Sequence, residues 1–390
     1  MAAKDRISEL PGDVIDHILG FLPIRDAART SALSTVWRDV WLSLSQLRFD
    51  RKFFNYIQYN YVMASAMFII NKILMKHNGP IRKFVFDFTM FYLKDDEDKS
   101  RWAEFDELLL FLTRNGVEEM DLSFESSAYI LPDFIYSCST LKKLSLCGVF
   151  IEPIKASCIF PNVTSLYLED VECDSKNLVQ CPADLPMLKS LVCRNISGFN
   201  ITAPKLSCLT ICFTLRQGIL PVNLDMKTIH SLHLDDYSTK DFIKELTRLG
   251  KQGTTLNVNH LKLGVDVKDD EISAFIDLLR MCPKLYRLDI LLPWDVEATT
   301  IDFLLEHPKF NVAETCKTVH ELHLFCMFSG SRGEMLLFKW LLTCFPMLKK
   351  LFVFQSTVFS SQTENRKKRK LLRFLRGSSK ANIVYIIERR

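Results

Sequence analysis

The chain has 390 residues, a formal net charge of +4 at pH 7 and 48% hydrophobic residues. This length exceeds one ordinary hydrophobic core, so we expect two domains or a repeat array. The composition is that of a globular protein, and the mild positive charge falls short of the strongly basic footprint of nucleic-acid binders.

Residues 10–44 are dense in apolar residues at helical spacing. One stripe contains Val14, Ile15, Ile18, Leu19 and Leu22. It ends at Pro23, because proline removes a backbone hydrogen-bond donor. A second stripe, which Ser34 is placed to cap, contains Leu33, Val36, Trp37, Val40, Trp41 and Leu44. A unit of about forty residues can hardly bury all of this surface within itself. We therefore expect it to dock on the rest of the chain or on a partner.

Residues 53–77 also show helical spacing and are rich in aromatic side chains. We expect this segment to cap the N-terminal end of the repeats that follow and to fix the direction of residues 1–50, because terminal repeats need cover. A helix lying on a membrane surface is the alternative, and no apolar run is long enough to span a bilayer.

A six-residue phrase, apolar-x-x-apolar-x-apolar, occurs eleven times in the following part of the chain. It begins at residues 81, 117, 141, 163, 188, 206, 229, 258, 285, 319 and 348. The average spacing of roughly 27 residues is typical of leucine-rich repeats. Between the phrases, residues 269–285 and 333–348 have apolar residues at helical steps. The pattern predicts an irregular β/α leucine-rich-repeat solenoid, with short parallel strands on the concave face and helices or loops outside.

The third and fifth positions of each phrase point away from the core. On the later strands these positions hold the candidates for a substrate-binding face, which are His233, His260, Lys262, Arg287, His323, Lys350 and Phe352. Basic and imidazole groups thus gather on the C-terminal half of the face. They favour a small anionic ligand or an acidic segment over a metal ion, and a solvated polar sheet surface is the simpler alternative.

No catalytic motif is present, since GxSxG, HExxH, GxGxxG and P-loop patterns are all missing from the sequence. The 12 cysteines are scattered, without the spacing of a zinc site or a disulfide scaffold. We therefore expect no enzymatic activity, no metal and no cofactor, and a reduced compartment, the nucleus or the cytoplasm.

Residues 366–376 hold seven Lys or Arg in eleven positions. The candidates for a nuclear import signal are Arg366, Lys367, Lys368, Arg369 and Lys370. The alternative is a solvated helix face whose apolar residues dock on the last repeat.

The segment LPGDVIDHILGFLPIRDAARTSALSTVWRDVW, residues 10–41, resembles an F-box. The matching features are Leu10-Pro11, Ile18-Leu19, Leu22-Pro23, Asp26, Arg29, Ser31, Leu33-Ser34, Trp37-Arg38 and Trp41. With repeats after it, the chain is similar to the plant F-box/LRR family, and residues 371–386 look like its FBD-type subgroup. We therefore expect an α+β chain: an all-α F-box (1–50), a helical cap (51–78), a solenoid (79–355) and a basic, FBD-like end cap (356–390).

The resemblance implies that the F-box binds a Skp-family adaptor, that the adaptor binds a cullin, and that the repeats hold an unknown protein substrate. The adaptor-binding residues that it implies are Leu10, Pro11, Ile15, Ile18, Leu19, Leu22, Pro23, Leu33, Ser34 and Trp37. The chain would then be the non-catalytic substrate-recognition subunit of a Skp–cullin–F-box ubiquitin ligase. One alternative is an interaction scaffold that acts without a cullin. Another, a nucleic-acid-binding solenoid, is disfavoured because basic residues do not interleave with aromatic ones along the strands.

Overall fold

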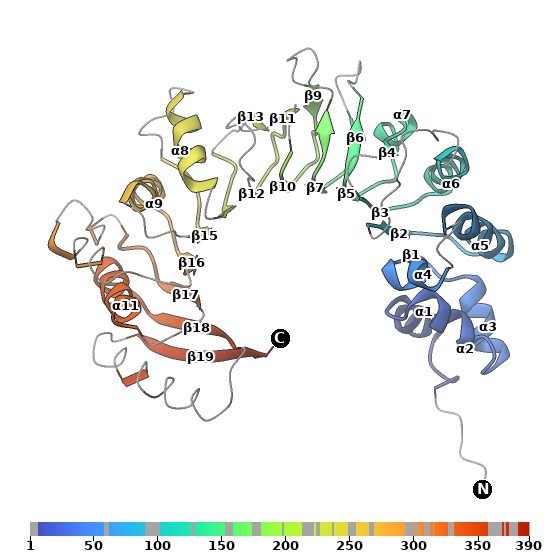
Figure 1. Ribbon diagram of the computed structural model, residues 1–390, viewed down its shortest axis with the longest axis horizontal. Helices are drawn as coiled ribbons and strands as arrows, with labels where there is room; N and C mark the ends of the chain where they lie inside the picture. Colours follow the sequence, from blue (N-terminus) through green and yellow to red (C-terminus); the bar gives the residue numbers. More distant parts are fainter. Residues whose placement is uncertain are drawn as a thin grey trace, which may run out of the picture. The chain divides into compact units, whose positions relative to one another are not determined.

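A computed structural model gives the structure of the chain (Figure 1). The described residues are 7–57, 62–89, 102–125, 129–152, 159–173, 181–196, 199–212, 222–223, 227–235, 238–248, 255–264, 269–292, 301–302, 305–307, 313–314, 316–326, 331–357, 369, 372–373 and 381–389. The chain forms two compact units, residues 1–205 with 221–223 and residues 206–220 with 224–390.

The first unit begins with three short helices, α1 (Gly12–Gly20), α2 (Ile24–Thr30) and α3 (Thr35–Leu42). Pro11 and Pro23 occupy the N-cap positions of α1 and α2, so Pro23 starts a second helix as well as following the first. Ser34 caps α3, because its hydroxyl oxygen accepts a hydrogen bond from the Trp37 N–H at 3.4 Å. The small core between the helices contains Ile15, Leu19, Ala27 and Trp37.

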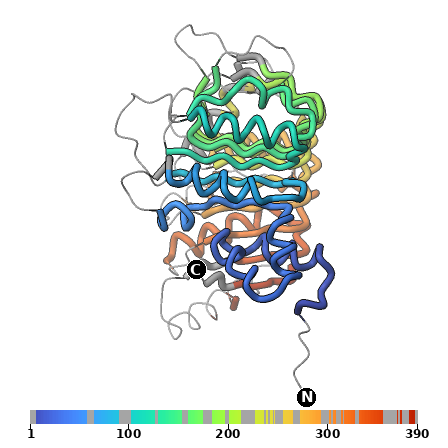
Figure 2. Tube along the Cα trace, turned by 90° about the vertical axis from the view of Figure 1, so that its right-hand side faces the viewer, coloured from blue at the N-terminus to red at the C-terminus, as the bar shows by residue number. Residues whose placement is uncertain are grey.

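The main sheet of the first unit consists of β1 (Gln46–Phe49), β2 (Lys83–Phe88), β3 (Glu119–Phe124), β5 (Lys143–Cys147), β7 (Ser165–Glu169) and β10 (Ser190–Arg194). These strands pair in parallel and in chain order. The helices between them are α4 (Arg51–Tyr56), α5 (Val62–Lys76), α6 (Ala103–Arg114) and α7 (Asp133–Tyr136). Figure 1 shows α5, α6 and α7 on one side of the strand layer, and Figure 2 shows successive turns of this unit stacked on one another.

Two small parallel sheets accompany the connections of the first unit. One contains β4 (Tyr129–Ile130), β6 (Val149–Ile151) and β8 (Glu172–Cys173). The other contains β9 (Cys181–Asp184), β11 (Phe199–Thr202) and β13 (Val222–Asn223). Short extended segments therefore take the place of helices in the middle repeats, where the sequence phrases lie closest together.

The second unit contains β12 (Cys208–Cys212), β14 (Ser231–Leu234), β15 (His260–Gly264), β16 (Arg287–Leu291), β17 (Glu321–Cys326), β18 (Lys350–Thr357) and β19 (Asn382–Arg389). These strands also pair in parallel and in chain order. Their connections include α8 (Ser238–Arg248), α9 (Asp269–Met281) and α11 (Arg332–Cys344). Helices α9 and α11 lie where the sequence predicts helices, and a capping box between Ser331 and Glu334 starts α11.

Each of the eleven predicted phrases corresponds to a strand, and each strand begins two residues after the first residue of its phrase. In the phrase that starts at Leu141, Leu144 and Leu146 are buried with it, whereas Lys143 and Ser145 alternate to the opposite face. Because the strands pair in register, residues at the same phrase position form rows across the sheet. The predicted α+β fold with parallel repeat strands is confirmed.

Strands β1 and β19 were not predicted. Residues 44–49 do match the phrase, but Leu44 also fits the preceding helical stripe, which conceals the match. Residues 380–385 lack the first apolar position, which is Lys380. The prediction that residues 1–50 are all-α is therefore corrected at β1, and the basic segment 356–390 contains the strand β19.

The N-terminal helices join the sheet without a linker. The carboxylate of Asp16, on α1, accepts hydrogen bonds from the Ser45 N–H at 2.8 Å and from the Ser45 hydroxyl at 2.6 Å. Gly79 passes so near to Ser43 that a Cβ atom on the glycine would lie 2.6 Å from the Ser43 carbonyl oxygen. These contacts fix α1 and the segment after α5 against the start of β1.

An aromatic core attaches helices α4 and α6 to strand β2. The Phe86 ring lies 4.3 Å from the Phe105 ring and 5.1 Å from the Phe54 ring, measured between centroids. All three side chains are completely buried. Aromatic contacts of this kind stabilise a fold beyond the area that they bury, so the helices next to the N-terminal segment and the first repeats share one core.

Among the described helices, none is both long and apolar enough to cross a membrane. Of the described cysteines, nine are free thiols, whereas Cys173 is disulfide-bonded. The scattered spacing of the cysteines does not predict this bond.

Gly116 provides the first test of this architecture. It ends α6 with a φ of +82°, and the next residue, Val117, donates its N–H to the Leu112 carbonyl oxygen at 3.2 Å. Side chains in this left-handed region cost about 1–2 kcal/mol. Gly116→Ala should therefore lower the free energy of unfolding by about 1 kcal/mol in denaturant titrations. Gly12→Ala is the matched control, because a Cβ there meets open space and no unusual φ; an equal loss in both variants would contradict this reading.

Candidate functional site

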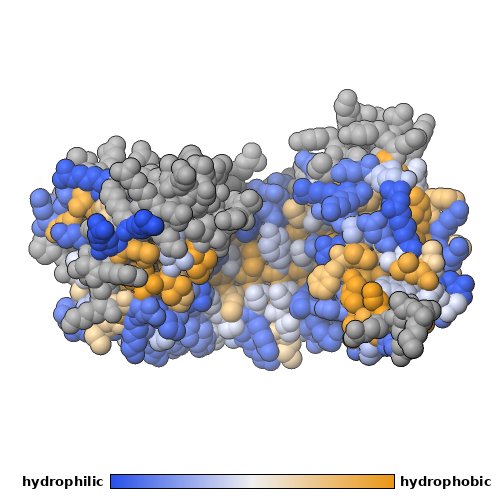
Figure 3. Space-filling model, turned by 90° about the horizontal axis from the view of Figure 1, so that it is seen from below, coloured by the Kyte–Doolittle hydropathy of each residue, from blue (hydrophilic) through white to orange (hydrophobic). Residues whose placement is uncertain are grey.

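The N-terminal helices expose five large apolar side chains. On α1, Val14 and Ile18 are 39% and 38% exposed, and Phe21, the residue that caps the end of this helix, is 76% exposed. Their spacing places the three on one face. At the start of α3, Leu33 and Val36 are 68% and 40% exposed, and α3 packs against α1. Figure 3 shows apolar side chains at the surface of the part that carries these helices. Exposed apolar patches of this kind mark interaction sites.

The structure divides the predicted adaptor-binding residues into three groups. Pro11, Ile18 and Leu33 are exposed, and Leu10, Leu22, Pro23 and Ser34 are half-buried. Ile15, Leu19 and Trp37 are buried in the core of the helices, with exposed fractions of 0%, 0% and 6%. Three of the ten predicted residues are therefore not accessible to a partner. The exposed apolar surface also includes three residues that were not among the predicted ones, Val14, Phe21 and Val36. Of these, only the two valines belong to the apolar stripes in the sequence.

A cavity of about 480 Å³ lies where α2 meets α4 and α5. Its apolar lining includes Ile24, Phe53 and Ile69. At its edge the Arg25 guanidinium sits 3.6 Å from the centre of the Tyr56 ring, in cation–π geometry. The junction between the helical segment and its cap is thus incompletely filled, in contrast to the tight aromatic core around β2.

The seven predicted substrate-face residues lie on five adjacent strands of the second unit. Strand register forms two rows from them and their neighbours. The first row is Ser231, His260, Arg287, Glu321 and Lys350, and the second is His233, Lys262, Asp289, His323 and Phe352. The sequence pattern therefore predicts which residues share this surface.

Asp289 is the centre of a polar network on this face. Its side chain is only 4% exposed, and Arg287 binds it with both ends of the guanidinium, at 2.8 Å from Nε to Oδ1 and 2.9 Å from Nη2 to Oδ2. His260 Nε2 lies 3.3 Å from Asp289 Oδ2, and His323 Nδ1 lies 3.9 Å from Oδ1. Paired, bidentate contacts of this kind are what allow a carboxylate to be buried.

The network determines the charges on the face. Burial alone would raise the pKa of Asp289, but hydrogen bonds from His260 and Arg287 hold that pKa well below its usual value. Burial lowers the pKa of His323, which favours the neutral imidazole. Lys350 is likewise paired, 2.9 Å from Glu321. Much of the positive charge that the sequence places on this face is therefore balanced by neighbouring carboxylates.

Ser231, His260 and Asp289 also lie in the order of a hydrolase triad. The Ser231 hydroxyl is 3.4 Å from His260 Nδ1, and the other ring nitrogen faces Asp289. In a working triad the carboxylate orients the imidazole and stabilises its charged form. Here Arg287 engages both carboxylate oxygens, so Asp289 is bound in an ion pair with Arg287 and is not reserved for orienting His260. We interpret the three residues as part of the polar network.

The basic run near the C-terminus and the expectation of no metal site are the remaining sequence predictions. In the proposed import signal, Arg369 is exposed, whereas Arg366, Lys367, Lys368 and Lys370 lie outside the described residues. Among the His, Cys, Asp and Glu side chains that the structure describes, no three converge as metal ligands.

Comparisons with known proteins relate both parts of the chain to one class. Residues 7–49 match the F-box domain family, and residues 105–225 match the repeats described as "FBD-associated F-box protein At5g56370, LRR repeats". The F-box/FBD/LRR-repeat protein At1g13570 of Arabidopsis thaliana is 32% identical over 213 residues, 53% of this chain and 49% of the relative. The F-box/LRR-repeat protein At4g14103 of the same plant is 30% identical over 203 residues, 50% of this chain and 51% of the relative.

The chain spans about half the length of these curated relatives. The matched segments nevertheless coincide with the helical segment α1–α3 and with the parallel repeats of the first unit. The chain thus contains one segment that matches the F-box domain and one that matches leucine-rich repeats of this class, and it is similar to the F-box/FBD/LRR-repeat proteins of Arabidopsis thaliana.

Proposed function

We propose that this chain is the non-catalytic substrate-recognition subunit of a Skp–cullin–F-box ubiquitin ligase. The observation that carries the proposal is the exposed apolar surface on α1 and α3, inside the segment that matches the F-box domain. A Skp-family adaptor covers this surface and brings the cullin with it. Burial of exposed aromatic and aliphatic side chains supplies most of the binding energy at interfaces of this kind.

In this proposal the target protein binds the strand face of the repeats. Besides its polar network, the second unit offers aromatic groups there, since the His323 ring lies 4.5 Å from the Phe352 ring and the Lys262 ammonium lies 5.4 Å from the centre of Phe325. Aromatic residues beside partly balanced charges are typical of protein–protein interfaces. We assign the activity to the nucleus or the cytoplasm, with the basic run at residues 366–370 serving import.

The junction between F-box and sheet supports a positioning role. The hydrogen bonds between Asp16 and Ser45, together with the close approach of Gly79 to Ser43, leave no flexible tether between the F-box and the first strand. A target bound to the first unit is therefore held at a set distance from the adaptor. A short, stiff connection of this kind raises the effective concentration of the target near the ubiquitin donor.

The alternative is an interaction scaffold that binds the adaptor without a cullin. The same F-box surface serves both functions, so geometry alone favours neither. Co-purification of a cullin and cullin-dependent ubiquitin transfer distinguish them.

Ile18 and Leu33 provide the test of adaptor binding. Ile18→Asp with Leu33→Asp should weaken binding to a Skp-family adaptor by about thirtyfold or more, because charges replace buried apolar contacts at the centre of the interface. Isothermal titration calorimetry measures the affinity, and circular dichroism checks that the helices persist. These positions are better probes than Leu10 and Pro11, since Pro11 caps α1 and Leu10 is half-buried. Met75→Asp is the control, on a side chain 88% exposed on α5; equal weakening by the control would count against the assigned surface.

Ubiquitin transfer provides the test of ligase function. In a reconstituted reaction with adaptor, cullin and RING subunit, the wild-type chain should support its own ubiquitination, and the Ile18→Asp, Leu33→Asp variant should not. The point variant is preferable to a chain that begins at residue 79, because that truncation removes β1, α4 and α5, including Phe54 from the core around Phe86. Adaptor binding without cullin-dependent transfer by the wild-type chain would support the scaffold.

A further inference from the structure

The cavity where α2 meets α4 and α5 adjoins a second cavity along α5. The second has a volume of about 340 Å³, and the residues that line both cavities are Ala28, Trp41, Ile69 and Ile73. The part of α5 that lines the two cavities runs from Phe68 to Lys76, which is about 12 Å along the helix axis. We call the two cavities together the junction cavity.

The walls of the junction cavity are apolar and come from four helices. Ile24 on α2 and Phe53 on α4 are buried, Trp41 on α3 is half-buried, and Ile69 on α5 is 37% exposed. Walls on several sides enclose a ligand better than a flat surface does, and cavities of a few hundred Å³ with mostly apolar walls are typical of small-molecule sites. The junction cavity therefore has the size and the lining to hold an apolar group.

The two tryptophans of α3 have different surroundings. The Trp37 indole is buried, and its N–H donates to the Ser8 hydroxyl oxygen at 3.1 Å. Trp41 lines both parts of the junction cavity, and within the described residues no group accepts a hydrogen bond from its indole N–H. Tryptophan N–H groups usually find a partner when they are buried, so Trp41 leaves a donor available to a ligand.

Basic side chains surround the apolar walls. The cations that line the junction cavity are Arg25, Lys52, Lys72 and Lys76, whereas the only acidic residue among its described lining is Asp26. Asp26 already pairs with Arg29, at 3.3 Å. Among the carboxylates that the structure describes, none forms an ion pair with the four cations. The junction cavity is therefore electropositive.

Arg25 is held in a position suited to a carboxylate. Its guanidinium lies 3.6 Å from the centre of the Tyr56 ring, and Lys52 lines the same part of the cavity. A guanidinium that stacks on an aromatic ring keeps the N–H donors in its own plane, where they can bind a carboxylate through two parallel hydrogen bonds. We therefore place an anionic group at Arg25 and Lys52, and an apolar group along α5.

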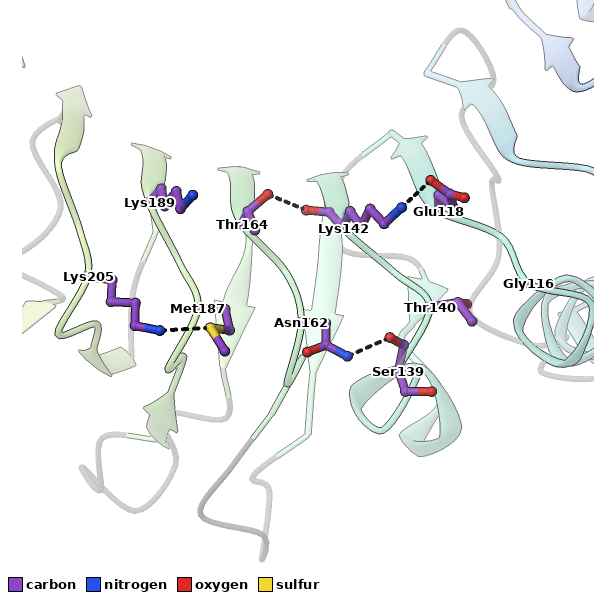
Figure 4. Close-up of a pocket in the computed structure, with 10 residues that line it drawn as sticks. All are labelled: Gly116, Glu118, Ser139, Thr140, Lys142, Asn162, Thr164, Met187, Lys189 and Lys205. Atoms are coloured by element: carbon purple, nitrogen blue, oxygen red, sulfur yellow. Dashed lines mark hydrogen bonds and ion pairs between the residues drawn. The ribbon is translucent and has the colours of Figure 1, made fainter.

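A third cavity of the first unit lacks this combination. It has a volume of about 530 Å³ and lies along the turns before the strands (Figure 4). Polar groups bind one another there, since Lys142 Nζ lies 2.6 Å from Glu118 Oε2 and Asn162 Nδ2 donates to the Ser139 carbonyl oxygen at 2.7 Å. Met187 is the only large apolar side chain in its described lining. Of these cavities, the junction cavity is thus the one suited to an amphipathic anion.

We propose that the junction cavity binds a small amphipathic carboxylate, with an unbranched apolar body up to about 12 Å long and its carboxylate between Arg25 and Lys52. Such a ligand joins α2 to α4 and α5, so it binds the folded chain and stabilises the junction between the F-box and the first repeats. The site is separate from the adaptor surface, because none of the five exposed apolar side chains on α1 and α3 lines it. The proposal goes beyond the proposed function, which requires no small molecule.

Isothermal titration calorimetry of the full chain tests the class of ligand, with every probe kept below the concentration at which it forms micelles. Dodecanoate should bind, with an affinity that falls as salt is added. Dodecanol and dodecyltrimethylammonium should bind at least about tenfold more weakly, because they lack the anionic group. Decanoate, which is shorter by two methylenes, should also bind about tenfold more weakly. Equal binding of dodecanol or of the cation, or no binding of dodecanoate, would overturn the proposal.

Two variants locate the site. Arg25→Gln with Lys52→Gln should weaken dodecanoate binding by about tenfold and leave dodecanol binding unchanged. Ala28→Leu, which enlarges a side chain in the wall that both cavities share, should weaken both ligands and remove the rise in melting temperature that dodecanoate causes in the wild-type chain. The control, Arg38→Gln with Arg114→Gln, removes the same charge from exposed residues outside the cavity. An equal loss in the control, or no loss in either variant, would contradict the assigned site.

Two further measurements separate this site from other surfaces. Ile18→Asp with Leu33→Asp should leave the dodecanoate affinity unchanged, whether or not the chain binds an adaptor. Loss of dodecanoate binding in that variant would place the ligand on the adaptor surface and overturn the proposal. Phosphatidylglycerol vesicles should bind the wild-type chain no more tightly than the Arg25→Gln, Lys52→Gln variant; tighter binding to the wild-type chain would identify a membrane-binding face instead.

Discussion

The parallel register of the strands is the constraint on which the rest of the structure depends. Each strand pairs with the next at the same phrase position, so residues 22 to 37 apart in sequence become neighbours in rows. The rows place leucines over leucines in the core and align the side chains on the opposite face and in the turns. Because β1 follows α3 directly and Asp16 holds Ser45, the first row begins within the F-box match. The segment that matches the F-box domain and the first repeats are therefore packed together as one element.

Periodicity predicts the repeat strands well and fails where two patterns overlap or one position changes. Eleven strands follow from the phrase because three apolar positions, all buried, are required in each repeat. Leu44 fits both a helical stripe and the first position of a phrase, and only tertiary pairing with β2 decides between them. Lys380 stands where an apolar residue is expected, and β19 forms because β18 offers an unpaired edge. Backbone pairing with β18 can therefore compensate for the missing apolar residue of β19. The local sequence does not reveal this pairing.

Site prediction has a different limit, because the net charge of a surface depends on pairing between repeats. Sequence alternation correctly gathers His260, Arg287 and Lys350 on one face. It does not show that the Asp289 carboxylate accepts two hydrogen bonds from Arg287, or that Glu321 forms an ion pair with Lys350 on the neighbouring strand. In the helices that match the F-box, the helical spacing identifies the apolar stripes but does not show which of their residues are buried. In the structure Ile15 is buried in the core, whereas Val14 is exposed. Both results depend on contacts between segments distant in sequence.

The positions that flank the strands are the most variable chemically on an otherwise repetitive framework. One residue before β3, β5, β7 and β10 of the first unit lie Glu118, Lys142, Thr164 and Lys189. At the same position in the second unit, Tyr286 stacks on His320 with rings 5.4 Å apart and nearly parallel. Both sets rest on the same main-chain ladder, since the N–H of His320 donates to the Tyr286 carbonyl oxygen as that of Lys142 does to Glu118. Substitution there leaves the buried phrase positions untouched. A repeat protein of this kind can therefore change the chemistry of its turns without altering its buried core.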